Sequence, residues 1–98
     1  MNISLKRFEL TRTYTINKLM NGDEFICYII EPAINKGALP YGKKSISCLT
    51  DLRLKPCYGY TDNMELTGER YARQSVEMLI EDIKKTGKAV TVNITRLF

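Results

Sequence analysis

Asn21 and Gly22 separate two stretches rich in β-branched and aromatic residues, "TYTINKLM" (13–20) and "EFICYII" (24–30). Asn-Gly is the pair that best tolerates the positive φ angles at both central positions of a type I′ turn, whose twist matches that of paired strands. The two stretches are therefore predicted to form an antiparallel hairpin. Because 24–30 is an almost unbroken apolar run, we expect its strand to be buried on both faces.

Two more stretches extend the predicted sheet. "SLKRFEL" (4–10) precedes the hairpin, and "SISCLTDLRL" (45–54) follows it, and both carry residues typical of strands. The intervening segment, 31–44, contains two prolines and two glycines, which predicts a loop.

One helix is predicted, over about 74–86. Ser75 is placed to cap its first turn and Gly87 to end it in a left-handed conformation. Four apolar residues recur at helical spacing and form one stripe: Val76, Leu79, Ile80 and Ile83. The final stretch, 88–97, alternates apolar and polar residues, which predicts a strand with one buried face.

These elements predict a small, β-rich α+β domain with an N-terminal hairpin, one C-terminal amphipathic helix and a final strand. The 98 residues are expected to form a single domain, 1–98. A chain of this length buries roughly two-thirds of its unfolded surface, which suffices for one modest core.

The chain contains no histidine and three cysteines, Cys27, Cys48 and Cys57. Without histidine there is no Ser-His or Cys-His pair, and no CxxC pair is present that would begin a zinc site. No metal site and no cofactor are predicted. The sequence shows neither an apolar run long enough for a membrane span nor a signal-peptide pattern, so we expect a cytoplasmic protein.

A net charge of +4 weakly favours an anionic partner, although lysine and arginine are spread along the whole chain. Tyrosines and basic residues gather between 55 and 73, where planar guanidinium groups and flat rings suit phosphate, carboxylate or protein contacts. The basic stretch "GALPYGKKS" (37–45) adds one more cation. The predicted binding residues are Lys43, Lys55, Cys57, Tyr58, Tyr60, Arg70 and Arg73.

Cys57 is the most plausible reactive thiol, because it is predicted to lie in a polar loop beside Lys55. A neighbouring cation lowers a thiol pKa and so favours the nucleophilic thiolate. With no histidine to relay protons, an unreactive cysteine is the competing interpretation.

The stretch "ELTRTYTINKLMNGDEFICYIIE" (9–31) resembles the opening of a bacterial and phage domain family of unknown function. Members of that family begin with an R-x-x-Y-T-I-G-x-L strand, which Tyr14, Thr15, Ile16 and Leu19 match, while Asn17 stands where the family has glycine. "GKKSIS" (42–47) is similar to the family's Gly-Lys-x-x-Ile-Pro segment, with Ser47 in place of proline.

The same family carries an H-x-G-N…G-C stretch that resembles the histidine and cysteine of L,D-transpeptidase-like enzymes. The matching segment here, "CYGY…NMELTG", has Cys57 at the histidine position and Met64 at the cysteine position. The resemblance therefore implies a site that has lost its nucleophile and base, and whose remaining capacity is to bind.

We therefore expect a non-enzymatic, phage-encoded binding protein in the host cytoplasm. It is predicted to counter host defence by binding a host defence protein or by sequestering an anionic small-molecule signal. One alternative is a peptidoglycan-directed enzyme that uses Cys57, and a second is a nucleic-acid-binding protein. The apolar stretches 24–30 and 88–98 suggest more strand surface than one helix covers, which predicts a homo-oligomer, most simply a dimer.

Overall fold

The predicted hairpin forms between β2 (Tyr14–Asn21) and β3 (Glu24–Pro32), which pair in antiparallel fashion. A computed structural model describes residues 3–46 and 54–96 of the chain. The turn differs from the type I′ prediction, because its two central residues are Gly22 and Asp23. Of these two residues, only Gly22 has a positive φ, 63°. Glycine adopts this conformation without steric cost, so it suits the first central position of the turn.

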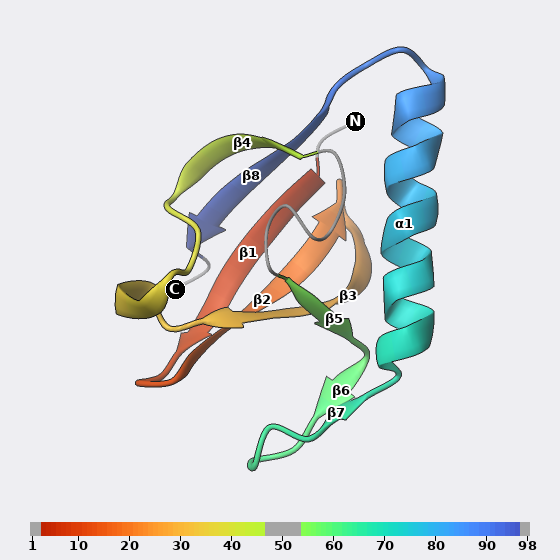
Figure 1. Cartoon of the computed structure of the whole chain (residues 1–98). Coiled ribbons are helices and arrows are strands. Elements are labelled where there is room, and N and C mark those ends of the chain that lie inside the picture. Colours follow the sequence, from red (N-terminus) through yellow and green to blue (C-terminus); the bar gives the residue numbers. More distant parts are fainter. Residues whose placement is uncertain (1–2, 47–53, 97–98) are drawn as a thin grey trace.

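A six-stranded sheet has the strand order β4-β8-β1-β2-β3-β5. Figure 1 shows it curling so that its two edge strands approach the viewer. Its remaining strands are β1 (Ile3–Leu10), β4 (Gly42–Ile46), β5 (Lys55–Cys57) and β8 (Val90–Arg96). The strands pair in antiparallel fashion except for β1 and β8, which run parallel at the middle of the sheet. These findings confirm the α+β class.

The helix α1 (Glu69–Lys85) begins about five residues earlier than predicted. Gly68, with φ 67°, is its N-cap, so Ser75 lies inside the helix and does not cap it. At the other end, the Thr86 hydroxyl donates a hydrogen bond to the Ile83 carbonyl at 2.6 Å. Gly87 follows with φ 77°, as predicted for a left-handed stop.

One face of the sheet, here called the inner face, packs against α1 (Figure 1). The helix contributes its predicted stripe, although Leu79 is only partly buried and Ala72 extends the stripe by one turn. The apolar side of β8, predicted from its alternation, faces this core. The buried residues from the sheet include Ile3, Leu5, Leu19, Cys27, Ile29, Val90, Val92 and Ile94.

Residues 33–46, which follow β3, are more ordered than the predicted loop. They contain a short 3-10 helix, η1 (Ile34–Lys36), and then β4, which pairs with β8. Lys43 therefore lies on an edge strand and not in a flexible loop. Of the strand predicted over 45–54, residues 47–53 lie outside the described residues, as does Cys48.

A buried ionic cluster continues the inner face beyond the end of the helix. Arg7 and Glu31 form an ion pair at 3.0 Å, and each side chain is about 1% exposed. Asn17 donates a hydrogen bond to Glu31 Oε1 at 2.7 Å, and the Leu39 backbone N–H donates to Glu31 Oε2 at 2.9 Å. Arg7 also donates to the Leu39 carbonyl. The cluster thereby fastens the segment after β3 onto the sheet.

Candidate functional site

Cys57 is not in a polar loop, as the sequence suggested, but in β5, where its side chain is fully buried. It packs with Ile16 and Ile30 in a second apolar cluster on the opposite, outer face of the sheet. Burial raises the pKa of the Cys57 thiol, and the nearby Glu69 carboxylate adds to that effect. A raised pKa disfavours the thiolate, so this environment is the opposite of an activating one.

Tyr58 turns away from the outer face and lies against the start of α1. Its hydroxyl is 2.6 Å from the Ser75 hydroxyl. Its ring packs on Gly68, where an added Cβ would come within 2.8 Å of the ring. Tyr58 is still 43% exposed. The residue predicted as a helix cap therefore serves to fix a neighbouring tyrosine.

Arg70 and Arg73 are exposed on α1. Each helical residue turns the side-chain direction by about 100°. Arg73 is two residues before Ser75, and thus roughly 200° around the helix from the partner of Tyr58. The helix therefore directs Arg73 to a different side of α1 from the one on which Tyr58 lies.

The remaining predicted residues are also dispersed. Lys43 on β4 and Lys55 on β5 lie on the two opposite edge strands of the sheet. Tyr60 packs on the outer face, with its ring 5.4 Å from that of Tyr28 in an edge-on arrangement. Burial raises the pKa of the Tyr60 hydroxyl, and the nearby Glu9 carboxylate adds to that effect.

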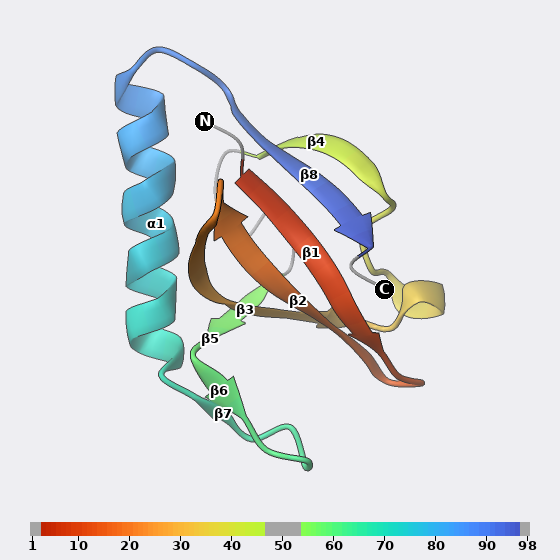
Figure 2. The ribbon, with the colours of Figure 1, turned by 180° about the vertical axis from the view of Figure 1, so that it is seen from behind.

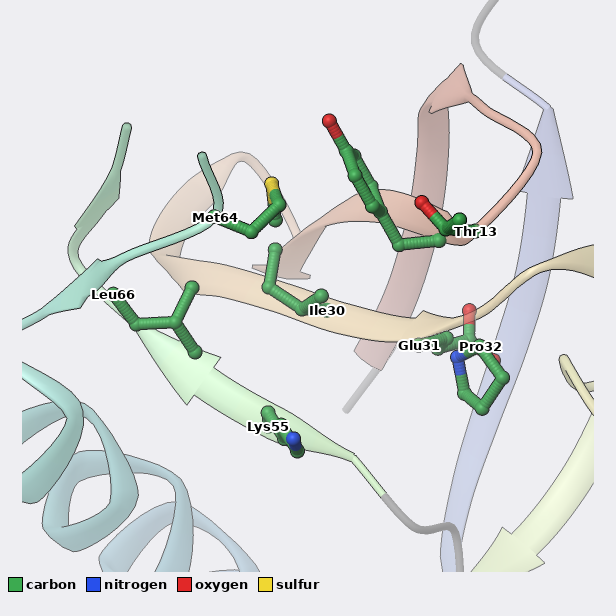
Figure 3. A pocket seen from close by; sticks show the side chains of 8 residues that line it. Thr13, Ile30, Glu31, Pro32, Lys55, Met64 and Leu66 are labelled. Carbon is green, nitrogen blue, oxygen red and sulfur yellow. The ribbon is translucent and has the colours of Figure 1, made fainter. Parts of the chain in front are cut away.

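A hollow near the predicted segment lies beside β3, where β5 begins (Figure 3). Its volume is about 460 Å³. Figure 3 shows Ile30, Met64 and Leu66 grouped together, with Lys55 on the strand below them. The lining residues are Thr13, Tyr14, Ile30, Glu31, Pro32, Lys55, Met64 and Leu66.

A small hairpin supplies one wall of this hollow. Its strands, β6 (Gly59–Tyr60) and β7 (Leu66–Thr67), are joined by a turn in which the Met64 N–H donates to the Thr61 carbonyl at 2.9 Å. Met64 has φ 59°, a left-handed conformation that glycine or asparagine adopts more easily. Methionine occupies this position although the conformation disfavours it, and its side chain packs against the outer apolar cluster.

The hollow offers few polar groups. Among the described residues that line it, Lys55 is the one cation, and Tyr14 and Thr13 add hydroxyl groups. The Glu31 carboxylate is engaged by Arg7, Asn17 and the Leu39 N–H. Within 3–46 and 54–96, no group of three or more Cys, Asp or Glu side chains is placed to hold a metal ion. Within the same ranges, no helix has the length and apolar character needed to cross a membrane.

Sequence reasoning identified Lys55 in this hollow but missed most of its lining. Tyr14, Met64 and Leu66 had been singled out only through the family resemblance, and Thr13 and Ile30 had carried no functional signal. These lining residues come together because the 59–67 hairpin folds back over β3. Predicting that hairpin would have revealed them, but it depends on a four-residue turn with methionine at its left-handed position.

No family model matches this chain, and comparison with curated proteins and with solved structures finds no significant match. The family resemblance of residues 9–31 and 42–47 therefore stays a prediction. Cys57 and Met64, which stand at the family's histidine and cysteine positions in that resemblance, both pack into the outer apolar cluster.

Proposed function

We propose that this protein is a non-catalytic binding protein that holds a small anionic molecule in the hollow beside β3. The observation that carries the proposal is the combination of an apolar floor, formed by Ile30, Met64 and Leu66, with the single exposed cation Lys55. Ligand sites of small proteins typically pair an apolar lining with a few polar groups that fix orientation.

The volume of about 460 Å³ sets the size of the ligand. It lies within the range of roughly 300–1,000 Å³ typical of small-molecule pockets. A molecule with one flat or apolar body and one phosphate or carboxylate group suits both the space and the single lysine. A nucleoside monophosphate or an aromatic carboxylate meets these requirements.

Two features support a binding role over catalysis. The thiol of Cys57, the one nucleophile suggested by the sequence, is buried and has a raised pKa. No histidine exists in the chain to act as its base. The alternative of a peptidoglycan-directed thiol enzyme therefore has less support than ligand binding.

The biological setting is a further proposal. A phage-encoded protein that sequesters an anionic signal, or that binds a host defence protein, would counter host defence in the host cytoplasm. Support for this setting comes from the family resemblance alone. Capture of the natural ligand from infected cells, with its identity read by mass spectrometry, tests this setting.

The predicted homodimer stays a prediction, with less support than the sequence suggested. Val90, Val92 and Ile94, which motivated it, are buried within the chain. Cys27 and Ile29 of the other apolar stretch are buried as well. The exposed edge of β4 is the feature that still favours a dimer. A solution mass of 11.3 kDa, that of one chain, would contradict the dimer.

The test of the proposed function is a titration calorimetry and thermal-shift series with nucleoside monophosphates and aromatic carboxylates. We expect at least one of these to bind, and Lys55→Met to weaken that binding about tenfold or more, because a charge-assisted contact is lost. Lys36→Met, which removes an exposed lysine on η1, is the matched control and should leave the affinity unchanged.

Met64→Asn probes the apolar floor in the same series. Asparagine suits the left-handed conformation, so the fold should be kept while the apolar contact is lost. The proposal fails if no probe binds, or if Lys55→Met and Lys36→Met have equal effects.

A further inference from the structure

The outer face of the six-stranded sheet is only partly covered. The β6–β7 hairpin packs over its β3 end, through Tyr60, Met64 and Leu66. Over β8, β1 and β2, no helix or strand of the described residues forms a covering layer, and Figure 2 shows these three strands in front of the rest of the sheet. A sheet normally buries at least one face, which here is the inner one, so the outer face is available for other uses.

The strand register places two lysines directly opposite each other on this face. Lys6 of β1 pairs with Lys18 of β2. On its other side Lys6 is level with Thr95 of β8, and Lys18 is level with Tyr28 of β3. Like charges that face each other across a strand pair destabilise a sheet, so this pair is unfavourable unless an anion lies nearby.

A third lysine joins them from the edge of the sheet. Lys43 of β4 is level with Asn93 of β8, and with Lys6 these residues line an open hollow of about 770 Å³. The hydroxyl and amide groups of Ser4, Thr91, Asn93 and Thr95 complete its floor. The acidic groups bordering the face are Asp23, at the hollow, and Glu9, near Tyr60. Cations therefore predominate along the centre of the face.

Aromatic rings continue the face beside the lysines. The Tyr28 ring is 6.0 Å from that of Phe8, 5.1 Å from that of Phe25 and 5.4 Å from that of Tyr60. Lys18 Nζ lies 5.4 Å from the centre of the Phe8 ring. Phe25 is 44% exposed. The rings thus lie beside the lysines on the same face of the sheet.

We propose that this outer face binds single-stranded nucleic acid. Lys6, Lys18 and Lys43 would take successive phosphates, and Phe8, Phe25 and Tyr28 would stack with bases. Proteins that bind single strands combine a basic track with aromatic side chains in this manner, since every base has a flat face. A duplex hides its base faces, so the aromatic half of the surface selects the single strand.

This proposal is independent of the hollow beside β3. The two sites share neither a lysine nor a stacking ring: the hollow relies on Lys55 and Met64, whereas the outer face relies on Lys6, Lys18 and Phe25. A variant at one site therefore tests that site alone.

The experiment is fluorescence anisotropy with a labelled ten-nucleotide oligothymidylate, measured at several salt concentrations. The other arms are oligouridylate, an abasic strand of the same length and a duplex. We expect a single strand to bind more tightly than the duplex, and the DNA and RNA arms then show which of the two is preferred. Tighter binding of the duplex would overturn the proposal, as would no binding of either single strand at low salt.

The charge variant is the double substitution Lys6→Thr and Lys18→Thr, with Lys36→Thr and Lys85→Thr as a control of equal net charge. Loss of two phosphate contacts should lower the slope of log affinity against log salt by about 1.4. We expect the affinity of the Lys6 and Lys18 double variant to fall about tenfold or more. An equal fall in the Lys36 and Lys85 control would show that only net charge matters, and the proposal would be wrong.

The stacking variant is Phe25→Leu, which keeps an apolar side chain at an exposed position. It should weaken binding of oligothymidylate several-fold and leave binding of the abasic strand unchanged. Equal affinity of the parent protein for the abasic strand and for oligothymidylate would contradict base stacking and overturn the proposal. Circular dichroism of each variant confirms that it is folded.

Discussion

The two faces of the sheet treat charge in opposite ways. On the inner face, the ion pair of Arg7 and Glu31 is almost fully buried, and the Glu31 carboxylate also accepts hydrogen bonds from Asn17 and the Leu39 N–H. On the outer face, Lys6 and Lys18 stand opposite each other, and Lys43 borders the same hollow. The charges of the inner face are thus paired within the fold, whereas those of the outer face remain available for the binding proposed above.

The largest expected effect comes from placing a charge in the inner core. Ile80→Asp, at a position that is 4% exposed, should lower the free energy of unfolding by about 4 kcal/mol or more, because an unpaired carboxylate would be buried. Met78→Asp, on the exposed side of the same helix, should change it by no more than about 0.5 kcal/mol. Urea denaturation of the two variants measures the contrast, and equal losses would refute the assignment of the inner face.

The second effect concerns the buried ion pair. Glu31→Ala leaves the Arg7 guanidinium without its carboxylate and should lower the free energy of unfolding by roughly 3–5 kcal/mol. Combining it with Arg7→Met should restore much of that loss, since both charges are then gone. Glu24→Ala, at an exposed position of the same strand, is the control. If the double variant were no more stable than Glu31→Ala, the ion pair would not be the source of the loss.

The third effect is a dependence on pH that arises from the inner core. Burial raises the pKa of Cys27 to about 12, and the nearby Cys57 adds to that effect. The folded protein therefore holds the thiol proton more tightly than the unfolded chain, where a thiol pKa is roughly 8.5. Stability from this group is fully present below about pH 8.5 and is lost as pH rises towards 12.

Unfolding measured at pH 7 and pH 10.5, in the presence of a reductant, checks this sign. Cys27→Ala should lower stability at both values because the contacts of the buried sulfur are lost, and it should reduce the drop between them. A drop of the same size in the variant would assign the pH dependence to other groups, of which Cys57 and Tyr60 also have raised pKa values.

The smallest effect is expected on the outer face and has the opposite sign. Lys6→Thr removes one of two directly opposed cations and should raise the free energy of unfolding by about 0.3 kcal/mol. Lys43→Thr, which faces Asn93, should leave stability unchanged. A loss of stability in Lys6→Thr would show that this lysine serves the fold, and would weaken the contrast between the faces.

The sequence predicted those parts of the fold whose signals are local. The hairpin at Gly22, the apolar stripe of α1 and the alternation of β8 all follow from short periodic patterns. The start of the helix was placed too late because Gly68 begins it with a positive φ, whereas Ser75 matched a cap preference and instead holds Tyr58. Such a choice depends on a tertiary contact that no local pattern reveals.

The sites were less predictable for the same reason. In "SLKRFEL", Lys6 and Arg7 look alike, yet one faces outward and the other is buried beside Glu31, 24 positions away. Tyr58 and Tyr60 are two positions apart in the sequence, yet Tyr58 lies against α1 and Tyr60 packs on Tyr28 of the outer face. Only the parallel pairing of β1 with β8 and the register of β1 with β2 bring Lys6, Lys18 and Asn93 to one face.

The parallel pairing of β1 with β8 also decides when the molecule can fold. β8 lies between β1 and β4, so the sheet stays divided until residues 90–96 are available. During synthesis, β1, β2 and β3 emerge first. The free edge of β1 then has no partner, and the core stays open, until residues 90–96 have left the ribosome. Folding of the sheet should therefore be limited by this late, long-range closure, and the strand edges that wait for it stay open to wrong pairing in the interval.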